Sequence, residues 1–311
     1  MPQDLPMPEP ARCRVALIAN AHAGRKDSGA RIAHIRSRLA PQVAEFTLKP
    51  VAKGGQIADA ARRAVAEGYD IVAALGGDGT QSAVAGALAG SAAAMAVLPG
   101  GTFNYFAREL GVEDMDRALD AVLGGRVQAR DLGAINDRIF INNASIGIYP
   151  QILVQREEIY RRWGRSRIAA YWSVLVALRD LRDPMHLQVT VDGQPRDYRT
   201  PLAFVARSAY QLDTLGLAGA EAVRAGHFAL FLAKGRTRWE LMSAAIRLAF
   251  GRTAHGADFD LVISDDMIIE SRSPRKLVAL DGEKARMTAP FRLKVLHGGL
   301  RVCVPAEGPA A

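Results

Sequence analysis

Short runs of consecutive apolar residues alternate with amphipathic segments over the first 125 residues of the chain. Unbroken apolar runs are typical of strands buried on both faces of a parallel sheet, and apolar residues three and four positions apart are typical of covering helices. The runs predict strands at 14–19, 43–48, 71–75 and 96–98. The amphipathic segments predict helices near 32–39 and at 56–67, 81–88, 105–110 and 115–123. This alternation predicts βαβ units and therefore a three-layer α/β domain with a parallel sheet.

From residue 127 onward, short runs separated by turn signals replace this pattern. Asp192-Gly193 and Asp281-Gly282 are typical of two-residue hairpin turns. We therefore expect an α/β domain at 12–126, followed by a mainly antiparallel β-sandwich domain at 127–306 with a helical insertion near 155–182. The runs lie at 127–132, 138–143, 187–191, 202–206, 227–233, 261–263, 267–271, 277–280 and 300–304.

Composition narrows the class of protein. A chain of 311 residues with 49% hydrophobic content exceeds what one core usually fills, so two domains are expected. The net charge of +8 favours acidic partners such as phosphates, nucleic acid or an anionic membrane face. Cys13 and Cys303 have neither metal-binding nor redox spacing. Without a signal sequence or a long apolar run, we expect a cytoplasmic protein, soluble or peripheral at the inner membrane face.

The stretch 155–182 carries seven arginines against three acidic residues, interleaved with tyrosines and tryptophans. Cations beside such rings suit a membrane interface, where the rings lie at headgroup depth. The alternative is a helical hairpin that packs its apolar residues inward and leaves a solvated basic face, and we favour it because amphipathicity alone does not establish membrane contact. A second helix, predicted at 239–250, has the same two interpretations: a wall of a lipid pocket or a cover for the sheet.

Two glycine-rich turns follow two of the predicted parallel strands, and the carboxyl ends of adjacent parallel strands form one ligand-binding edge. Glycine lets the backbone approach a bulky anion, and the N-terminus of the helix after the first turn attracts negative charge. A phosphate is the expected ligand, and Asp78 so close to it predicts a role with a cation or a proton. The alternative is a tight turn in which Asp78 or Thr80 caps the helix. The turns are Gly76-Gly77-Asp78-Gly79-Thr80 and Gly100-Gly101-Thr102-Phe103-Asn104.

Three motifs together resemble the catalytic signature of the diacylglycerol kinase-like lipid kinases, a group that includes the sphingosine kinases. They are LGGDGT at 75–80, LPGGTFNYFAREL at 98–110 and LDGE at 280–283. The resemblance spans about 14–305 and implies an NAD kinase/diacylglycerol kinase-like fold, with the closing strand returning toward the first domain. The first motif alone is shared with NAD kinases.

The resemblance also implies roles for particular residues. Asp78 would lie beside the transferred phosphate, and Glu283 would accept the proton of the lipid hydroxyl. Asp131 would reach a magnesium ion through water and Asp78 would contact it, so ATP and Mg²⁺ are the implied cofactors. From the residues alone, Asp281-Gly282-Glu283 reads as a hairpin turn. The implied nucleotide-binding residues are Asn20, Gly76, Gly77, Gly79, Thr80, Gly100, Gly101, Thr102 and Asn104.

The chain departs from the family pattern at three places. Ala21 replaces the proline of the first turn, and Ser82-Ala83 stands where Asn-Glu is common. Ala225 stands where many members have an aspartate that helps to bind a structural magnesium ion, and an alanine side chain cannot ligate a cation.

We therefore expect an ATP-dependent lipid kinase that phosphorylates a hydroxyl of diacylglycerol or a related lipid. P-loop and protein-kinase motifs are missing from the sequence. The alternatives are an NAD kinase and a catalytically inactive lipid- or nucleotide-binding regulator. The expected partners are a lipid substrate and the membrane surface rather than nucleic acid, and a homodimer stays open. The sequence does not identify the acceptor lipid.

Overall fold

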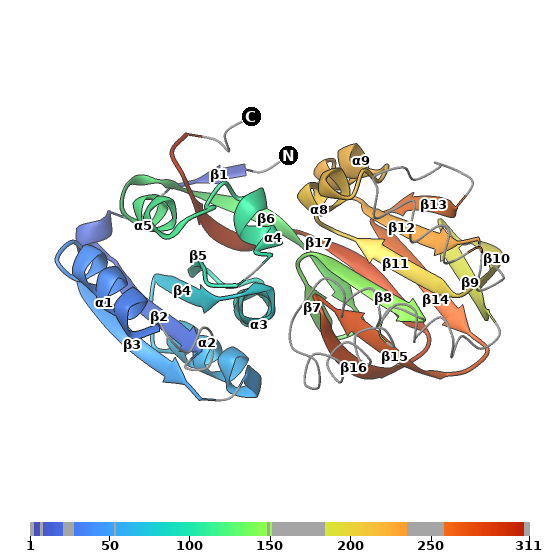
Figure 1. Ribbon diagram of the computed structural model, residues 1–311, viewed down its shortest axis with the longest axis horizontal. Helices are drawn as coiled ribbons and strands as arrows, with labels where there is room; N and C mark the ends of the chain where they lie inside the picture. The colour runs from blue at the N-terminus through green and yellow to red at the C-terminus, as the bar shows by residue number, and fades with distance from the viewer. Residues whose placement is uncertain are drawn as a thin grey trace. The chain divides into compact units, whose positions relative to one another are not determined.

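The computed structural model describes residues 3–6, 9–20, 28–52, 54–101, 103–147, 150, 184–234, 240 and 258–307. The chain divides into two compact units (Figure 1). The first comprises Met1–Leu132, Ile139–Ile141 and Leu296–Ala311, and the second comprises Gly133–Arg138 and Asn142–Val295. The domain limits drawn from the sequence, 12–126 and 127–306, stay predictions.

The first unit is built on a parallel sheet with the strand order β3-β2-β4-β5. The strands are β2 (Arg14–Asn20), β3 (Glu45–Val51), β4 (Ile71–Gly76) and β5 (Ala94–Pro99). All six residues of β4 are buried, as its unbroken apolar run predicts. The end of β17 (Phe291–Val304) extends the sheet, because Arg301 pairs in parallel with Ala94 of β5. The end of the last strand of the chain therefore returns to the first unit, as the resemblance implies.

Helices cover both faces of this sheet (Figure 1), which gives the predicted three layers. On one face lie α1 (Ser28–Leu39) and α5 (Met115–Gly124), joined by an ion pair of 2.7 Å between Arg38 and Asp120. On the other lie α2 (Ile57–Ala66) and α3 (Asp78–Leu88). The unit also contains η1 (Pro10–Arg12), η2 (Gly54–Gln56), α4 (Tyr105–Glu109), and β1 (Gln3–Leu5) antiparallel to the start of β6 (Arg126–Ile135).

The second unit is antiparallel, as predicted. In the described part of the chain, one sheet has the order β13-β12-β11-β8-β15-β16, and a second layer has the order β10-β9-β14-β17. The first contains β8 (Asn143–Gly147), β11 (Leu202–Ala206), β12 (Phe228–Ala233), β13 (Phe259–Ser264), β15 (Arg275–Leu280) and β16 (Glu283–Thr288). The second contains β9 (Met185–Val191), β10 (Gln194–Thr200), β14 (Asp266–Ser271) and the first part of β17. The helices are α8 (Ala209–Thr214) and α9 (Ala220–Arg224).

Several elements differ from the sequence prediction. Strands β10, β16 and the start of β17 were not predicted. The first four residues of β10 are exposed and β16 has a single buried residue, so neither has an apolar run, whereas the start of β17 alternates buried and exposed residues, a half-buried strand pattern that was missed. The predicted run 138–143 divides into β7 (Arg138–Phe140) and β8. Helix α3 begins at Asp78, three residues before the predicted start, and α8 and α9 were not predicted.

The predicted helix at 155–182 lies outside the described residues, as does the one at 239–250 apart from residue 240. In the part of the chain that the structure does describe, no helix is long and apolar enough to cross a membrane.

Candidate functional site

The first glycine turn connects β4 directly to α3. The N–H groups of Thr80 and Gln81 donate to the carbonyl of Gly77, at 2.9 and 3.0 Å. The Gln81 side chain is completely buried, and its Nε2 donates to the carbonyl of Gly76 at 3.1 Å. Gln81 therefore fixes the end of β4. Sequence reasoning missed this residue, whose only signal is a polar side chain on the buried side of an alanine-rich helix.

The second glycine turn packs directly against the first, as expected for turns that end neighbouring parallel strands. The N–H of Gly100 donates to the carbonyl of Gly76 at 3.0 Å. A Cβ atom on Gly101 would lie only 2.5 Å from the Cα of Gly77. Contact between the two turns is therefore enough to require glycine here, independently of any ligand.

The carboxylate of Asp78 joins the two turns. Its Oδ1 accepts the N–H of Tyr105 at 2.9 Å, and its Oδ2 accepts the N–H of Asn104 at 3.1 Å. Asn104 has a left-handed backbone, with φ of +50°, and its side chain accepts from the N–H of Gly101 at 3.0 Å and donates to the carbonyl of Gly101 at 2.9 Å. Asp78 thus stabilises the start of α4. It does not cap its own helix, because the N-cap of α3 is Gly77 without a side-chain cap.

Burial and hydrogen bonding have opposite effects on the pKa of the Asp78 carboxyl group. Burial raises the pKa of Asp78, and the N–H bonds from Tyr105 and Asn104 oppose that rise. Among the described residues, the N–H groups of Gly77 and Gly79 have no hydrogen-bond partner. Both lie at the N-terminus of α3, where the helix dipole favours an anion. The turn can therefore hold a phosphate beside a carboxylate.

The other predicted nucleotide-binding residues differ in whether their polar groups are available to a ligand. In the second turn, the N–H groups of Gly100 and Gly101 already donate within the protein. Thr80 is buried in the first turn of α3. Thr102 and the side chain of Asn20 lie outside the described residues. Sequence reasoning assigned no role to Phe103, which is 54% exposed and stacks on Tyr105 with ring centroids 5.7 Å apart.

Glu283 begins β16 in the second unit, immediately after the predicted Asp281-Gly282 turn. The residue is exposed to solvent. Desolvation of its carboxyl group raises the pKa of Glu283, and the positive charge of Arg138 opposes the rise. A carboxylate with a raised pKa is better suited to accept a proton near neutral pH than an ordinary surface glutamate.

Asp78 and Asp131, the two residues predicted to reach a metal, both accept hydrogen bonds from backbone N–H groups of the protein. The Oδ1 of Asp131 accepts the N–H of Gly298 at 2.9 Å, and its Oδ2 lies 3.5 Å from the Nδ1 of His297, in the same unit. In the described ranges, no group of three His, Cys, Asp or Glu side chains could hold a metal ion. Ala225, at the end of α9, contributes no side-chain ligand.

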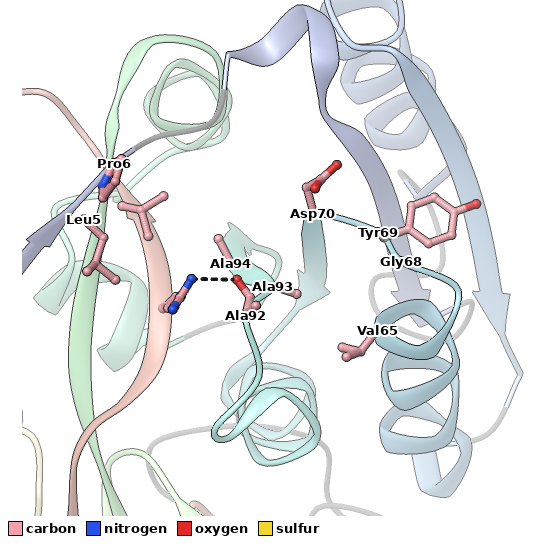
Figure 2. A pocket seen from close by; sticks show the side chains of 11 residues that line it. Leu5, Pro6, Val65, Gly68, Tyr69, Asp70, Ala92, Ala93 and Ala94 are labelled. Atoms are coloured by element: carbon pink, nitrogen blue, oxygen red, sulfur yellow. Dashed lines mark hydrogen bonds between the residues drawn. The ribbon is translucent and has the colours of Figure 1, made fainter.

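A pocket of about 460 Å³ lies elsewhere in the first unit (Figure 2). It is lined by apolar residues such as Leu5, Val65 and Ala93 together with Asp70 and Arg301, and the Nη1 of Arg301 donates to the carbonyl of Ala92 at 3.3 Å. Asp70 precedes β4 and Ala94 begins β5. The pocket is therefore at the amino ends of these strands, opposite the glycine turns, and is not the predicted site.

Comparisons with known proteins show which family and fold the chain resembles. Residues 14–135 match the diacylglycerol kinase catalytic domain. The chain is 26% identical to a diacylglycerol kinase of Bacillus subtilis over 94% of this chain and 97% of that protein. It is 32% identical over 144 residues to a diacylglycerol kinase of Staphylococcus aureus, which covers 45% of this chain and 46% of that one.

The fold has solved counterparts. The crystal structure of a diacylglycerol kinase from Bacillus anthracis superposes with a TM-score of 0.70 at 22% identity, over 94% of this chain and 96% of that one. The catalytic-domain match over residues 14–135, the relative matched over nearly its full length and the shared fold all support one family for this chain, the diacylglycerol kinase-like family.

Proposed function

We propose that the protein is an ATP-dependent lipid kinase that transfers the γ-phosphate to a hydroxyl of diacylglycerol or a related lipid. One observation carries the proposal: the Asp78 carboxylate joins two glycine turns at the carboxyl ends of β4 and β5, beside the N–H groups of Gly77 and Gly79, which have no hydrogen-bond partner in the part of the chain that the structure describes. Phosphoryl transfer requires that the reactants be held in position and that the negative charge of the phosphates be stabilised. The N–H groups at the start of α3 would do both for a bound phosphate.

ATP is the proposed donor. Its phosphates would accept the free N–H groups of the first turn and gain from the dipole of α3. Mg²⁺ fits this site only as a companion of the nucleotide, since the described residues form no three-ligand cluster. Such an ion takes phosphate and water oxygens and one or two carboxylates, here Asp78 and, through water, Asp131. The ion would neutralise charge on the phosphates.

Glu283 is the proposed general base. It would take the proton of the lipid hydroxyl as the hydroxyl oxygen bonds to the γ-phosphorus. The bond between that phosphorus and the bridging oxygen then breaks, and ADP leaves with the bonding electrons. The products are a phosphorylated lipid and ADP, and the proton stays on Glu283 until it passes to water.

The lipid acceptor is supported by the relatives, two of which are named diacylglycerol kinases. A diacylglycerol-like substrate resides in a membrane, so we also propose peripheral contact of the protein with the inner membrane face. The net charge of +8 supports this contact, because anionic lipid attracts basic proteins.

The test is transfer of radiolabel from γ-labelled ATP to a mixed panel of diacylglycerol, monoacylglycerol, sphingosine and NAD. We expect label in one or more lipids, and a loss of about 100-fold or more in Glu283→Gln, in line with general-base catalysis. Asp78→Asn should lose activity as well.

Other outcomes separate the alternatives. Label in NAD with none in lipid would establish an NAD kinase. Binding of ATP with no transfer to any acceptor would favour an inactive regulator. Full activity in both Asp78→Asn and Glu283→Gln would remove the mechanism.

A further inference from the structure

The Asp281-Gly282 turn is fixed to the second unit by the side chain of its first residue. The Oδ1 of Asp281 accepts the N–H of Asn142 at 2.7 Å and the N–H of Asn143 at 3.0 Å. The N–H of Asp281 donates to the carbonyl of Asn143 at 2.9 Å. Asp281 is only 9% exposed, so these bonds are protected from water. They connect the turn to the start of β8, 139 residues earlier in the chain.

The turn itself does not need this carboxylate. Asp192-Gly193 joins β9 to β10 through the same two-residue loop, with φ of +51° and +72°, against +48° and +88° in Asp281-Gly282. Positive φ at both positions is the geometry of a type I′ turn. Asp192 is exposed and makes no hydrogen bond among the described residues. Of these two copies of one turn, the copy that precedes Glu283 has the buried, bonded aspartate and the other does not.

The start of β8 is itself held in place. The Nδ2 of Asn143 donates to the Oε1 of Gln211 at 3.0 Å. Ser208 caps α8 by accepting the N–H of Gln211 at 3.2 Å, and the N–H of Arg207 donates to the carbonyl of Asn142 at 2.8 Å. All of these residues are buried. Asp281 is thus bonded to a backbone segment that a buried polar cluster keeps rigid.

We propose that Asp281 is a positioning residue: its carboxylate fixes the turn on β8 and thereby sets the place of the Glu283 carboxyl group two residues later. The inference rests on the proposed function, in which Glu283 accepts the proton of the lipid hydroxyl. A general base acts only within hydrogen-bond reach of that proton, and a displacement of about 1 Å can reduce the rate by about 100-fold.

The experiment compares Asp281→Ala and Asp281→Asn with the matched control Asp192→Ala. Both alanines would stand at a left-handed backbone position, so the strain is similar. We expect Asp281→Ala to lower kcat for lipid phosphorylation at least about tenfold with little change in the KM for ATP, whereas Asp192→Ala stays within about twofold of the wild type. Asp281→Asn should recover most of the activity, because asparagine tolerates positive φ and offers an oxygen at Oδ1.

Amide hydrogen exchange at Asn142 and Asn143 provides a reading that does not depend on activity. It should become faster in Asp281→Ala and stay slow in Asp281→Asn and Asp192→Ala. A normal kcat in Asp281→Ala with faster exchange would overturn the positioning role alone. The positioning role would also be overturned if the Asp281→Asn variant were as inactive as Asp281→Ala while its amide exchange stayed slow. That result would mean that activity requires the negative charge of Asp281 rather than its hydrogen bonds. No transfer by the wild type to any lipid would overturn the proposed function and this inference with it.

Discussion

At the scale of single residues, the carboxylate of Asp78 has a structural task as well as the proposed chemical one. It accepts two backbone N–H groups, one on each oxygen, at the start of α4. The two N–H groups each use one carboxylate oxygen, and the side chain of an asparagine has only one oxygen that can accept a hydrogen bond. The same residue is partly desolvated, which raises its pKa and penalises its charged form. A substitution therefore changes stability through two opposing effects.

For Asp78→Asn we expect a net loss of about 1 kcal/mol in the free energy of unfolding, measured by urea denaturation at neutral pH. One N–H would lose its acceptor, and this outweighs the relief of the desolvated charge. The control is Asp114→Asn, because Asp114 caps α5 by accepting the N–H of Arg117 at 2.8 Å and asparagine is an equally good cap. It should change stability by less than about 0.5 kcal/mol. Equal losses in the two variants would contradict the account.

The pKa of Glu283 gives a prediction for the pH profile. Because its pKa is raised above 4.5, the acidic limb of kcat/KM should lie above that value, where Glu283 loses the proton that blocks it as a base. Arg138→Gln removes a charge that lowers this pKa, so the limb should move to higher pH. Arg272→Gln, at an exposed residue before β15, should leave the limb in place. A limb that moves to lower pH in Arg138→Gln would contradict the assignment of Glu283.

At the scale of elements, β2 and β3 are joined by a polar cluster at one end of the sheet. Glu45 accepts from the Nε of Arg14 at 2.7 Å, the hydroxyl of Tyr69 at 2.7 Å and the hydroxyl of Thr47 at 3.0 Å. The bond from Arg14 is the main cause that lowers the pKa of Glu45 from 4.5 to about 2, followed by those from Tyr69 and Thr47. The cluster connects β2 and β3 to the residues just before β4.

This shift predicts how stability depends on pH. The folded state holds Glu45 ionised more strongly than the unfolded state does, so its contribution is present above pH 4.5 and is lost as the pH falls through about 2. The difference in unfolding free energy between the wild type and Glu45→Gln should therefore be constant near neutral pH and shrink below 4.5. Urea unfolding from pH 7 to pH 3 measures it, with the exposed Glu113→Gln as control. A difference that grows on acidification would refute this reading of the cluster.

An element can be predicted from the sequence when its own residues form a continuous hydrophobic pattern. The run at β4 and the buried alanine face of α2 are continuous patterns, and both are confirmed. Strand β10 has a mostly exposed, charged sequence whose pairing with β9 comes from the turn rather than from hydrophobicity. The same holds for the site. The two glycine turns can be recognised in the sequence. The hydrogen bonds of Asp78 and Asp281 cannot, because their donors are backbone N–H groups 27 and 139 residues away and a backbone donor leaves no pattern of side chains in the sequence.

At the scale of the whole molecule, the chain divides the proposed reaction between its two compact units. The glycine turns and Asp78 belong to the first, and Glu283, with its tethered turn, belongs to the second. The catalytic-domain match covers residues 14–135 and therefore includes Asp78 but not Glu283. The proposal requires both carboxylates in one transfer reaction, so Glu283 is the residue on which the account depends most.

The most direct measurement is the rate at which the wild type, Glu283→Gln and the exposed control Glu270→Gln transfer labelled γ-phosphate from ATP to diacylglycerol in mixed micelles. The account predicts that Glu283→Gln lowers kcat by about 100-fold or more with the KM for ATP nearly unchanged, and that Glu270→Gln equals the wild type. A Glu283→Gln enzyme that transfers phosphate at the wild-type rate would contradict it.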